Sequence, residues 1–127
     1  MIRVYVAGAY SSDKITDMLG NMRRGIALSV KVLQAGYAPF CPWLDFQFGL
    51  LAEIPLDTYY EYSMTWLRAS DAVLLVPGWE GSVGVKAEME EAKRLGIPVF
   101  WTLDEMKDWT LPEQDNRGIQ ATGGRDE

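Results

Sequence analysis

The sequence predicts a single α/β domain built on a parallel sheet of about four to five strands, with helices on both faces. Three observations lead to this prediction. A β-branched run at 2–7 ends at a glycine, short apolar runs alternate along the chain with segments of helical periodicity, and the length of 127 residues suits one domain. Strands that alternate with helices form parallel sheets covered on both sides. The expected architecture is therefore doubly wound, of the flavodoxin or Rossmann type.

The first half of the chain contains two predicted strands and one long helix. Residues 2–7, "IRVYVA", form a buried strand followed by a turn. A helix begins within "YSSDKITDM" and runs to about Ala35, with Gly36 as its C-cap. Its predicted buried stripe consists of Leu19, Met22, Ile26, Val30 and Leu33. "YAPFC" follows as a short strand, and residues 42–56 are predicted as a loop with one helical turn.

The second half repeats the alternation. Asp57 is the predicted N-cap of a helix to about Ala69 with Tyr60, Met64 and Leu67 on one face, and "DAVLLV" at 71–76 is the clearest buried strand. A glycine-containing loop, a helix over about 83–95 and the strand "IPVFW" come next, and a short helix at 103–109 closes a domain of residues 1–111. Residues 112–127 are polar and rich in glycine, so we expect a mobile tail there.

The composition excludes several kinds of function. The chain has no histidine and one cysteine, Cys41, which removes Ser-His and Cys-His nucleophile pairs, a disulfide within the chain and the usual zinc sites. We therefore expect no metal and no cofactor, and a reducing cytoplasm as the location. The net charge is −6 without a basic stripe in the sequence, so polymeric nucleic acid is not an expected partner. No apolar run approaches the ~20 residues that cross a bilayer, and the chain begins directly with a strand, so no membrane partner is expected either.

The predicted fold selects three loops as the place of a ligand site. In doubly wound sheets ligands bind where the strands end and the helices begin. The loops at 8–12, 41–45 and 77–84 occupy that edge. The first of them, "GAYSS", offers free amides and a helix N-terminus, as an anion site does. Taken alone, however, the loop is better explained as an ordinary strand-to-helix turn with Ser11 or Ser12 as the cap.

The loop "GWEGSVG" at 78–84 contains three glycines and places Ser82 at the N-cap of the next helix. Capping explains the serine but not Gly84, because a glycine in the first helical turn weakens the helix. Close approach of a ligand to the backbone would explain it. The sequence therefore favours a binding role for this loop.

Glu88 interrupts the apolar stripe of the helix at 83–95. The stripe consists of Val85, Met89, Ala92 and Leu95. An ionised carboxylate buried without partners costs several kcal/mol, so Glu88 needs polar partners, water or a raised pKa. It is either a functional carboxylate facing a crevice or a boundary residue that reaches solvent past Leu95, and the pattern alone supports the two equally.

An aromatic-rich stretch lies between the second and third strands. Its side chains could wall a pocket for a flat ligand, fill the core or form the face of a homodimer. They are Trp43, Phe46, Phe48, Tyr59, Tyr60, Tyr62 and Trp66.

Two segments carry a resemblance to a known family. "VYVAGAYS" at the first strand and "SDAVLLVPGWEGSVGVKAEMEEAKRLGIPVF" at the third and fourth resemble the nucleoside 2-deoxyribosyltransferase superfamily. The most specific part is a Ser-x-Gly-x-x-x-Glu core formed by Ser82, Gly84 and Glu88. Within the superfamily the chain is most similar to small uncharacterised members and to the nucleoside 5′-monophosphate N-glycosidases.

The resemblance implies a function in which an N-glycosidic bond is cleaved or transferred. Glu88 corresponds to the nucleophile that attacks the anomeric carbon, and Tyr5 would lie beside it and orient it. Ser82 and the loop Gly8, Ala9, Tyr10, Ser11 and Ser12 would hold a 5′-phosphate. The implied partners are a nucleoside or nucleotide and a second copy of the chain, because the sites of family members are completed by a neighbour and the segment 42–62 is too apolar for a free loop.

One position departs from the family pattern. Ser63 stands where members commonly carry an aspartate that positions the sugar or assists the leaving base. Asp45, Asp57 and Glu61 are candidates to take its place, with Trp43 as a further accessory residue. The alternative to an enzyme is a non-catalytic nucleotide sensor that keeps the fold and the phosphate loops.

Overall fold

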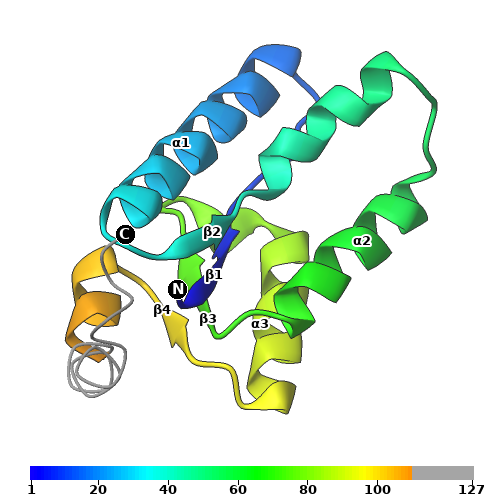
Figure 1. Cartoon of the computed structure of the whole chain (residues 1–127). Helices are drawn as coiled ribbons and strands as arrows, with labels where there is room; N and C mark the ends of the chain where they lie inside the picture. Colours follow the sequence, from blue (N-terminus) through cyan, green and yellow to red (C-terminus); the bar gives the residue numbers. More distant parts are fainter. Residues whose placement is uncertain (110–127) are drawn as a thin grey trace.

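The computed structural model describes residues 1–109, in which strands and helices alternate along the chain (Figure 1). The predicted tail at 112–127 and the last two residues of the predicted domain lie outside the described residues. The elements are β1 (Arg3–Ala7), α1 (Ile15–Gln34), β2 (Ala38–Phe40), the 3-10 helix η1 (Pro42–Leu50), α2 (Leu56–Arg68), β3 (Ala72–Leu75), the 3-10 turn η2 (Trp79–Gly81), α3 (Val83–Leu95) and β4 (Val99–Phe100). The predicted short helix at 103–109 is also present.

The four strands form one parallel sheet in the order β2-β1-β3-β4. β1 pairs with β2 on one side, with Arg3 opposite Ala38, and with β3 on the other, with Val4 opposite Ala72. The chain thus moves outward from β1 to β2 and then returns to the opposite side of β1. This order is flavodoxin-like and confirms the predicted fold, and its switch point lies between β1 and β3.

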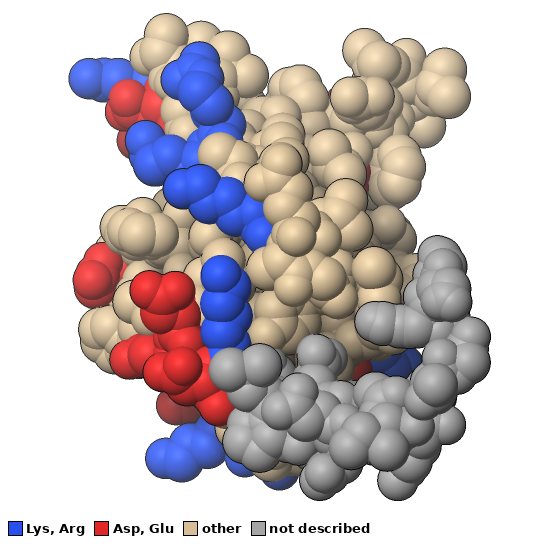
Figure 2. Space-filling model, turned by 60° about the vertical axis from the view of Figure 1, so that its left-hand side comes forward, with Lys and Arg blue, Asp and Glu red and all other residues tan. Residues whose placement is uncertain are grey.

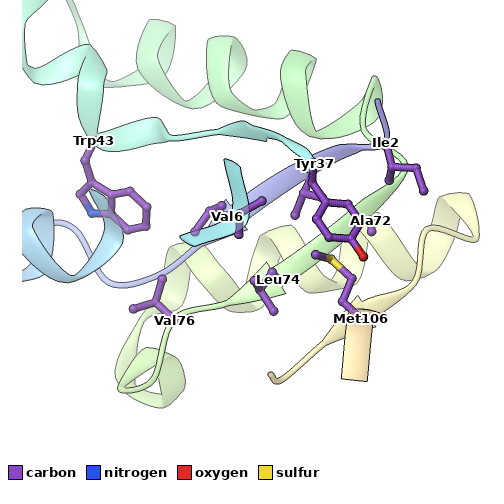
Figure 3. Close-up of a cluster of buried hydrophobic side chains, with 10 residues drawn as sticks. Ile2, Val6, Tyr37, Trp43, Ala72, Leu74, Val76 and Met106 are labelled. Atoms are coloured by element: carbon purple, nitrogen blue, oxygen red, sulfur yellow. The ribbon is translucent and has the colours of Figure 1, made fainter. Parts of the chain in front are cut away.

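Helices cover both faces of the sheet, so successive strand residues pack in opposite directions. Val4, Val6 and Leu74 belong to the core cluster shared with α1 and the 103–109 helix, which contributes Met106 (Figure 3). Tyr5, Val73 and Leu75 belong to a second cluster, shared with α2 and α3. Tyr5 therefore points toward the face that carries Glu88.

The buried stripe predicted for α1 is wrong in part. Leu19, Val30 and Leu33 are exposed, and the fully buried positions are Gly25, Ser29 and Val32, with Met22 and Ile26 packed at the edge of the core. The reason is the indole of Trp43, which fills the space over Gly25: a Cβ on Gly25 would come within 2.4 Å of that ring. Hydrophobic periodicity counts apolar side chains and gives no weight to a glycine that receives a tryptophan.

Two further details differ from the prediction. The stretch expected as a loop with one turn is the nine-residue helix η1, and Pro55, rather than Asp57, occupies the N-cap position of α2. Leu67 is buried as expected, whereas Tyr60 is exposed. A proline that precedes a helix fixes an extended backbone there and needs no side-chain cap.

The surface charges are unevenly distributed. Figure 2 shows a band of Lys and Arg side chains on one side of the molecule, with a group of Asp and Glu below it. A basic band was not expected from the sequence, and α1 contributes the exposed residues Arg23, Arg24 and Lys31 to the surface. Between residues 1 and 109 no helix combines the length and hydropathy needed to cross a lipid bilayer.

Candidate active site

A pocket of about 680 Å³ opens at the carboxyl ends of β1 and β3, the edge that the fold predicts for a ligand. All three loops selected from the sequence contribute to it. The lining residues are Gly8, Ala9, Tyr10, Ser11, Pro42, Asp45, Phe46, Gly49, Leu56, Tyr59, Tyr60, Ser63, Gly78, Gly81, Ser82, Val83, Gly84, Val85 and Glu88. This set contains two carboxylates and neither a lysine nor an arginine.

Glu88 lines the pocket and lies about one and a half turns into α3. Its neighbours on the helix, Val85 and Ala92, are buried against the sheet, whereas Glu88 is half-buried. The phenol of Tyr5 on β1 donates a hydrogen bond of 2.7 Å to Oε2 of Glu88. The two residues that the resemblance pairs, 83 positions apart in the chain, are therefore in direct contact.

The surroundings change the acidity of this pair. Burial raises the pKa of the Glu88 carboxyl to about 7, and the hydrogen bond from Tyr5 opposes that rise. Burial, followed by the charge of Glu88, raises the pKa of Tyr5 far above its ordinary value, so the phenol stays a proton donor. Near neutral pH, Glu88 is poised between its neutral and ionised forms.

Ser82 caps α3 as predicted, because its Oγ accepts a hydrogen bond of 3.2 Å from the backbone N–H of Val85. Gly84 follows in the first turn and lines the pocket. A Cβ built on Gly84 would meet only the Ser82 Oγ, at 3.8 Å, so packing within the described chain does not require a glycine there. The pocket extends to this residue, and the close approach of a ligand there stays a prediction.

The loop after β1 contributes in a different way. Gly8 is required by packing, because a Cβ there would lie 2.7 Å from the Cβ of Val76. Gly8, Ala9, Tyr10 and Ser11 line the pocket. Ser12 does not: it is exposed, and its hydroxyl accepts a hydrogen bond from the backbone N–H of Lys14.

Some of the accessory residues predicted from the sequence line the pocket, and others do not. Trp43 is buried and does not line the pocket. Its indole N–H donates a 3.1 Å hydrogen bond to the carbonyl of Ala9, so it holds the pocket-lining loop in place. Ser63 lines the pocket and hydrogen-bonds the Tyr5 phenol, which lowers the pKa of that tyrosine slightly against the larger opposing effects. Of the three carboxylates considered as substitutes for the family aspartate, only Asp45 lines the pocket; Asp57 and Glu61 are exposed on α2.

The aromatic stretch divides between two tasks. Phe46, Tyr59 and Tyr60 line the pocket. Phe40 stacks on Tyr5 at 5.5 Å between ring centroids and on Trp66 at 5.6 Å, which fixes the position of the tyrosine that holds Glu88. The sequence suggested the aromatic wall but not this stacked support, because Phe40 comes from β2 and Trp66 from α2.

Sequence reasoning also missed a second tyrosine–carboxylate pair. The Tyr10 phenol donates a 2.7 Å hydrogen bond to Oδ1 of Asp45. Tyr10 was expected to serve a phosphate loop through its backbone, and no local pattern links it to a residue 35 positions later. Within residues 1–109 no group of three or more acidic or cysteine side chains gathers in the manner of a metal site.

Comparison with known protein families places most of the chain in one family. The chain belongs to the family described as Domain of unknown function (DUF4406), whose model matches residues 2–101. That range contains β1 to β4 and every residue lining the pocket. No curated protein matches the chain, so the resemblance to nucleoside 2-deoxyribosyltransferases stays a prediction.

Proposed function

We propose that this protein cleaves or transfers the N-glycosidic bond of a nucleoside or a nucleoside 5′-monophosphate, with Glu88 as the nucleophile. One observation carries the proposal. A half-buried carboxylate with a pKa of about 7 lines an aromatic-walled pocket and is held by a buried tyrosine. Strongly raised pKa values in a cleft are typical of functional carboxylates.

The pocket has a place for each part of such a substrate. Phe46, Tyr59 and Tyr60 offer flat surfaces to a nucleobase, and Glu88 would face the anomeric carbon. Departure of the base leaves an oxocarbenium-like centre, which a carboxylate stabilises and then traps as a covalent intermediate. Ser82, Gly84 and the N-terminus of α3 offer a hydroxyl and backbone amides to the 5′ end of the sugar.

The family resemblance supports the same assignment for Glu88, Tyr5 and Ser82. Ser63 favours the alternative, a nucleotide-binding protein without catalysis, because it replaces an aspartate that members of that superfamily commonly carry. The two functions differ in one observable, the release of free base.

The direct test is to incubate the protein with a panel of nucleosides and their 5′-monophosphates and to follow free base by chromatography. We expect release from at least one substrate, and a loss of release in Glu88→Gln. Glu90→Gln, on the same helix and exposed, is the matched control and should retain activity. If the protein binds nucleotides but releases no base, the catalytic function is wrong and the nucleotide-binding function takes its place.

We also propose that the protein forms a homodimer or a larger homo-oligomer. The segment from η1 to the start of α2 exposes a series of large apolar side chains, which is unusual for the surface of a small monomer. They are Leu44, Phe46, Phe48, Leu50, Leu51, Leu56 and Tyr60. Light scattering at micromolar concentration should give at least twice the 14.3 kDa mass of one chain, and a monomer would contradict the proposal.

A further inference from the structure

Asp45 is a second carboxylate of the pocket, and the fold holds it in one place. It is only 6% exposed, and its Oδ1 accepts the hydrogen bond from the Tyr10 phenol. Two residues earlier, Trp43 is bonded to the carbonyl of Ala9 and packed over Gly25. The beginning of η1 is therefore fixed to the loop after β1 and to α1, and Asp45 is fixed with it.

No basic side chain of residues 1–109 forms an ion pair with Asp45. The ion pairs of the described residues involve Arg3, Arg68 and Arg94, none of which contacts Asp45. A buried carboxylate without a cation is costly when ionised, and carboxylates in such surroundings are common at functional sites, where they hold and release protons. Burial raises the pKa of Asp45, and the hydrogen bond from Tyr10 opposes this rise.

The two carboxylates line one pocket from different segments of the chain. Glu88 comes from α3 and is bonded to Tyr5, whereas Asp45 comes from η1 and is bonded to Tyr10. Their charges are close enough that both raise the pKa of the Tyr5 phenol. Enzymes that break glycosidic bonds need such a pair, one carboxylate to attack carbon and one to move a proton.

We propose that Asp45 is the acid–base residue of this site, giving a proton to the departing nucleobase and accepting one from the water that releases the sugar. This inference rests on the proposed function, since it assigns a second role in the same reaction. It also explains how the site could work with Ser63 in the position of the family aspartate.

The proposed reaction balances over two steps. In the first, a Glu88 carboxylate oxygen forms a bond to the anomeric carbon while the bond from that carbon to the base breaks. The electron pair of the broken bond stays on the base nitrogens, and one of these takes the proton of Asp45. In the second, water attacks the anomeric carbon, Asp45 takes the water proton, and the ester bond returns its electron pair to Glu88.

The need for a proton depends on the leaving group, and this dependence provides the test. A nucleobase is a poor anion and leaves readily only when protonated, whereas p-nitrophenolate leaves without a proton. We would compare Asp45→Asn with the wild type on the best nucleoside and on the p-nitrophenyl glycoside of the same sugar. Asp57→Asn, an exposed aspartate of α2 outside the pocket, is the matched control.

We expect Asp45→Asn to lose about 10²- to 10⁴-fold in kcat/KM on the nucleoside, the usual contribution of general acid–base catalysis, and only a few-fold on the p-nitrophenyl glycoside. Equal losses on both substrates, or no loss on either, would overturn the role of Asp45. Glu88→Gln should lose activity on both. If the wild type releases no base from any nucleoside or nucleotide, the proposed function fails; if it does and Asp45→Asn shows no split, only this inference fails.

A second variant keeps the test valid should Asp45→Asn fail to fold. Tyr10→Phe removes the hydrogen bond that favours ionised Asp45, so the pKa of Asp45 should rise. The ratio of kcat/KM on the nucleoside to kcat/KM on the p-nitrophenyl glycoside should then begin to fall at a higher pH than in the wild type, since only the nucleoside needs protonated Asp45. The titratable groups around this pair are Tyr59 and Cys41, which act on Tyr10, and Tyr5, whose pKa Asp45 raises; Glu88 lines the same pocket, and the variant leaves all four in place. An unchanged pH dependence of this ratio would contradict the assignment.

Discussion

Glu88 and Glu91 are three residues apart on α3, and their surroundings shift their acidity in opposite directions. Glu91 accepts hydrogen bonds from Arg94 at 2.8 Å and from Arg68 at 2.9 Å, and these arginines lower its pKa to about 2. Glu88 accepts its hydrogen bond from the Tyr5 phenol and lines a pocket to which residues 1–109 contribute no lysine or arginine, and burial raises its pKa to about 7.

The difference distinguishes a carboxylate that joins two helices from one whose pKa suits a role in catalysis. Glu91 joins α3 to α2 through Arg68 and stays ionised at any physiological pH. Glu88 is kept near the point where it can exist in either form, on a helix stripe that would pack better with an apolar residue. The periodicity of α3 sets the position of both residues, and the groups around each carboxylate set its pKa.

The largest expected effect concerns turnover. Glu88→Gln keeps the size and hydrogen-bonding reach of the side chain but removes the attacking charge, so kcat should fall by at least about 10³-fold. Glu91→Gln should leave kcat within a few-fold of the wild type, because Glu91 does not line the pocket. Steady-state rates of base release measure both; comparable losses in the two variants would remove the distinction between them.

The next effect is on the pH dependence of activity. Attack requires ionised Glu88, so kcat/KM for a p-nitrophenyl glycoside, which needs no proton from Asp45, should rise tenfold per pH unit below about 7 and level off above it. Tyr5→Phe removes a hydrogen bond that favours the ionised form, so the acid limb should move to higher pH. A limb near pH 4.5 in the wild type would show that burial does not control Glu88.

The stability of the folded protein should respond to the same pKa. Folding raises the pKa of Glu88 from 4.5 to about 7, so the folded state binds more protons between these values and stability falls as pH rises through them. At 1.36 kcal/mol per unit, the loss is about 3 kcal/mol above pH 7. Glu88→Gln avoids it and should be more stable than the wild type by about that amount at pH 8, and by little at pH 4.5.

Glu91 gives the opposite sign in the same denaturation series. Its pKa is lowered on folding, first by Arg94 and then by Arg68, so its contribution is present above its ordinary pKa and is lost as pH falls toward 2. Glu91→Gln should therefore lower the midpoint of urea unfolding at pH 7. A higher midpoint would mean that the Arg94 and Arg68 contacts do not stabilise the helix pair.

The smallest expected effect concerns Gly84. Alanine has room there and favours helix, so Gly84→Ala should raise the free energy of unfolding by up to about 1 kcal/mol. The same methyl group would project into the pocket and weaken nucleoside binding measured by calorimetry. Greater stability with unchanged affinity would remove Gly84 from the binding surface.

The features that could be predicted from the sequence are those that depend on residue types and spacing within one segment. The bounds of α3, its cap at Ser82 and the odd place of Glu88 follow from spacing alone, and the parallel sheet follows from the buried runs of β1 and β3. The family pattern added Tyr5 as the partner of Glu88, a contact that no spacing rule could supply.

The rest depended on contacts between distant segments. The buried face of α1 is set by Trp43 over Gly25, and the pairing of Tyr10 with Asp45 joins the loop before that helix to η1, which follows β2. Asp57 satisfied the rule for an N-cap, yet the chain begins α2 at the residue after Pro55. In each case a tertiary contact or a backbone constraint outweighed the local preference.

The most direct test of the account is a search for the covalent intermediate. A sugar substrate with a good leaving group and a fluorine beside the anomeric carbon, which slows the second step, should leave a sugar ester on the protein. After digestion with trypsin, mass spectrometry should find the added sugar mass on the peptide of residues 87–93, and fragmentation should assign it to Glu88 rather than to Glu90 or Glu91. Release of the leaving group with that peptide unmodified, or with the sugar on another residue, would contradict the role of Glu88 as nucleophile.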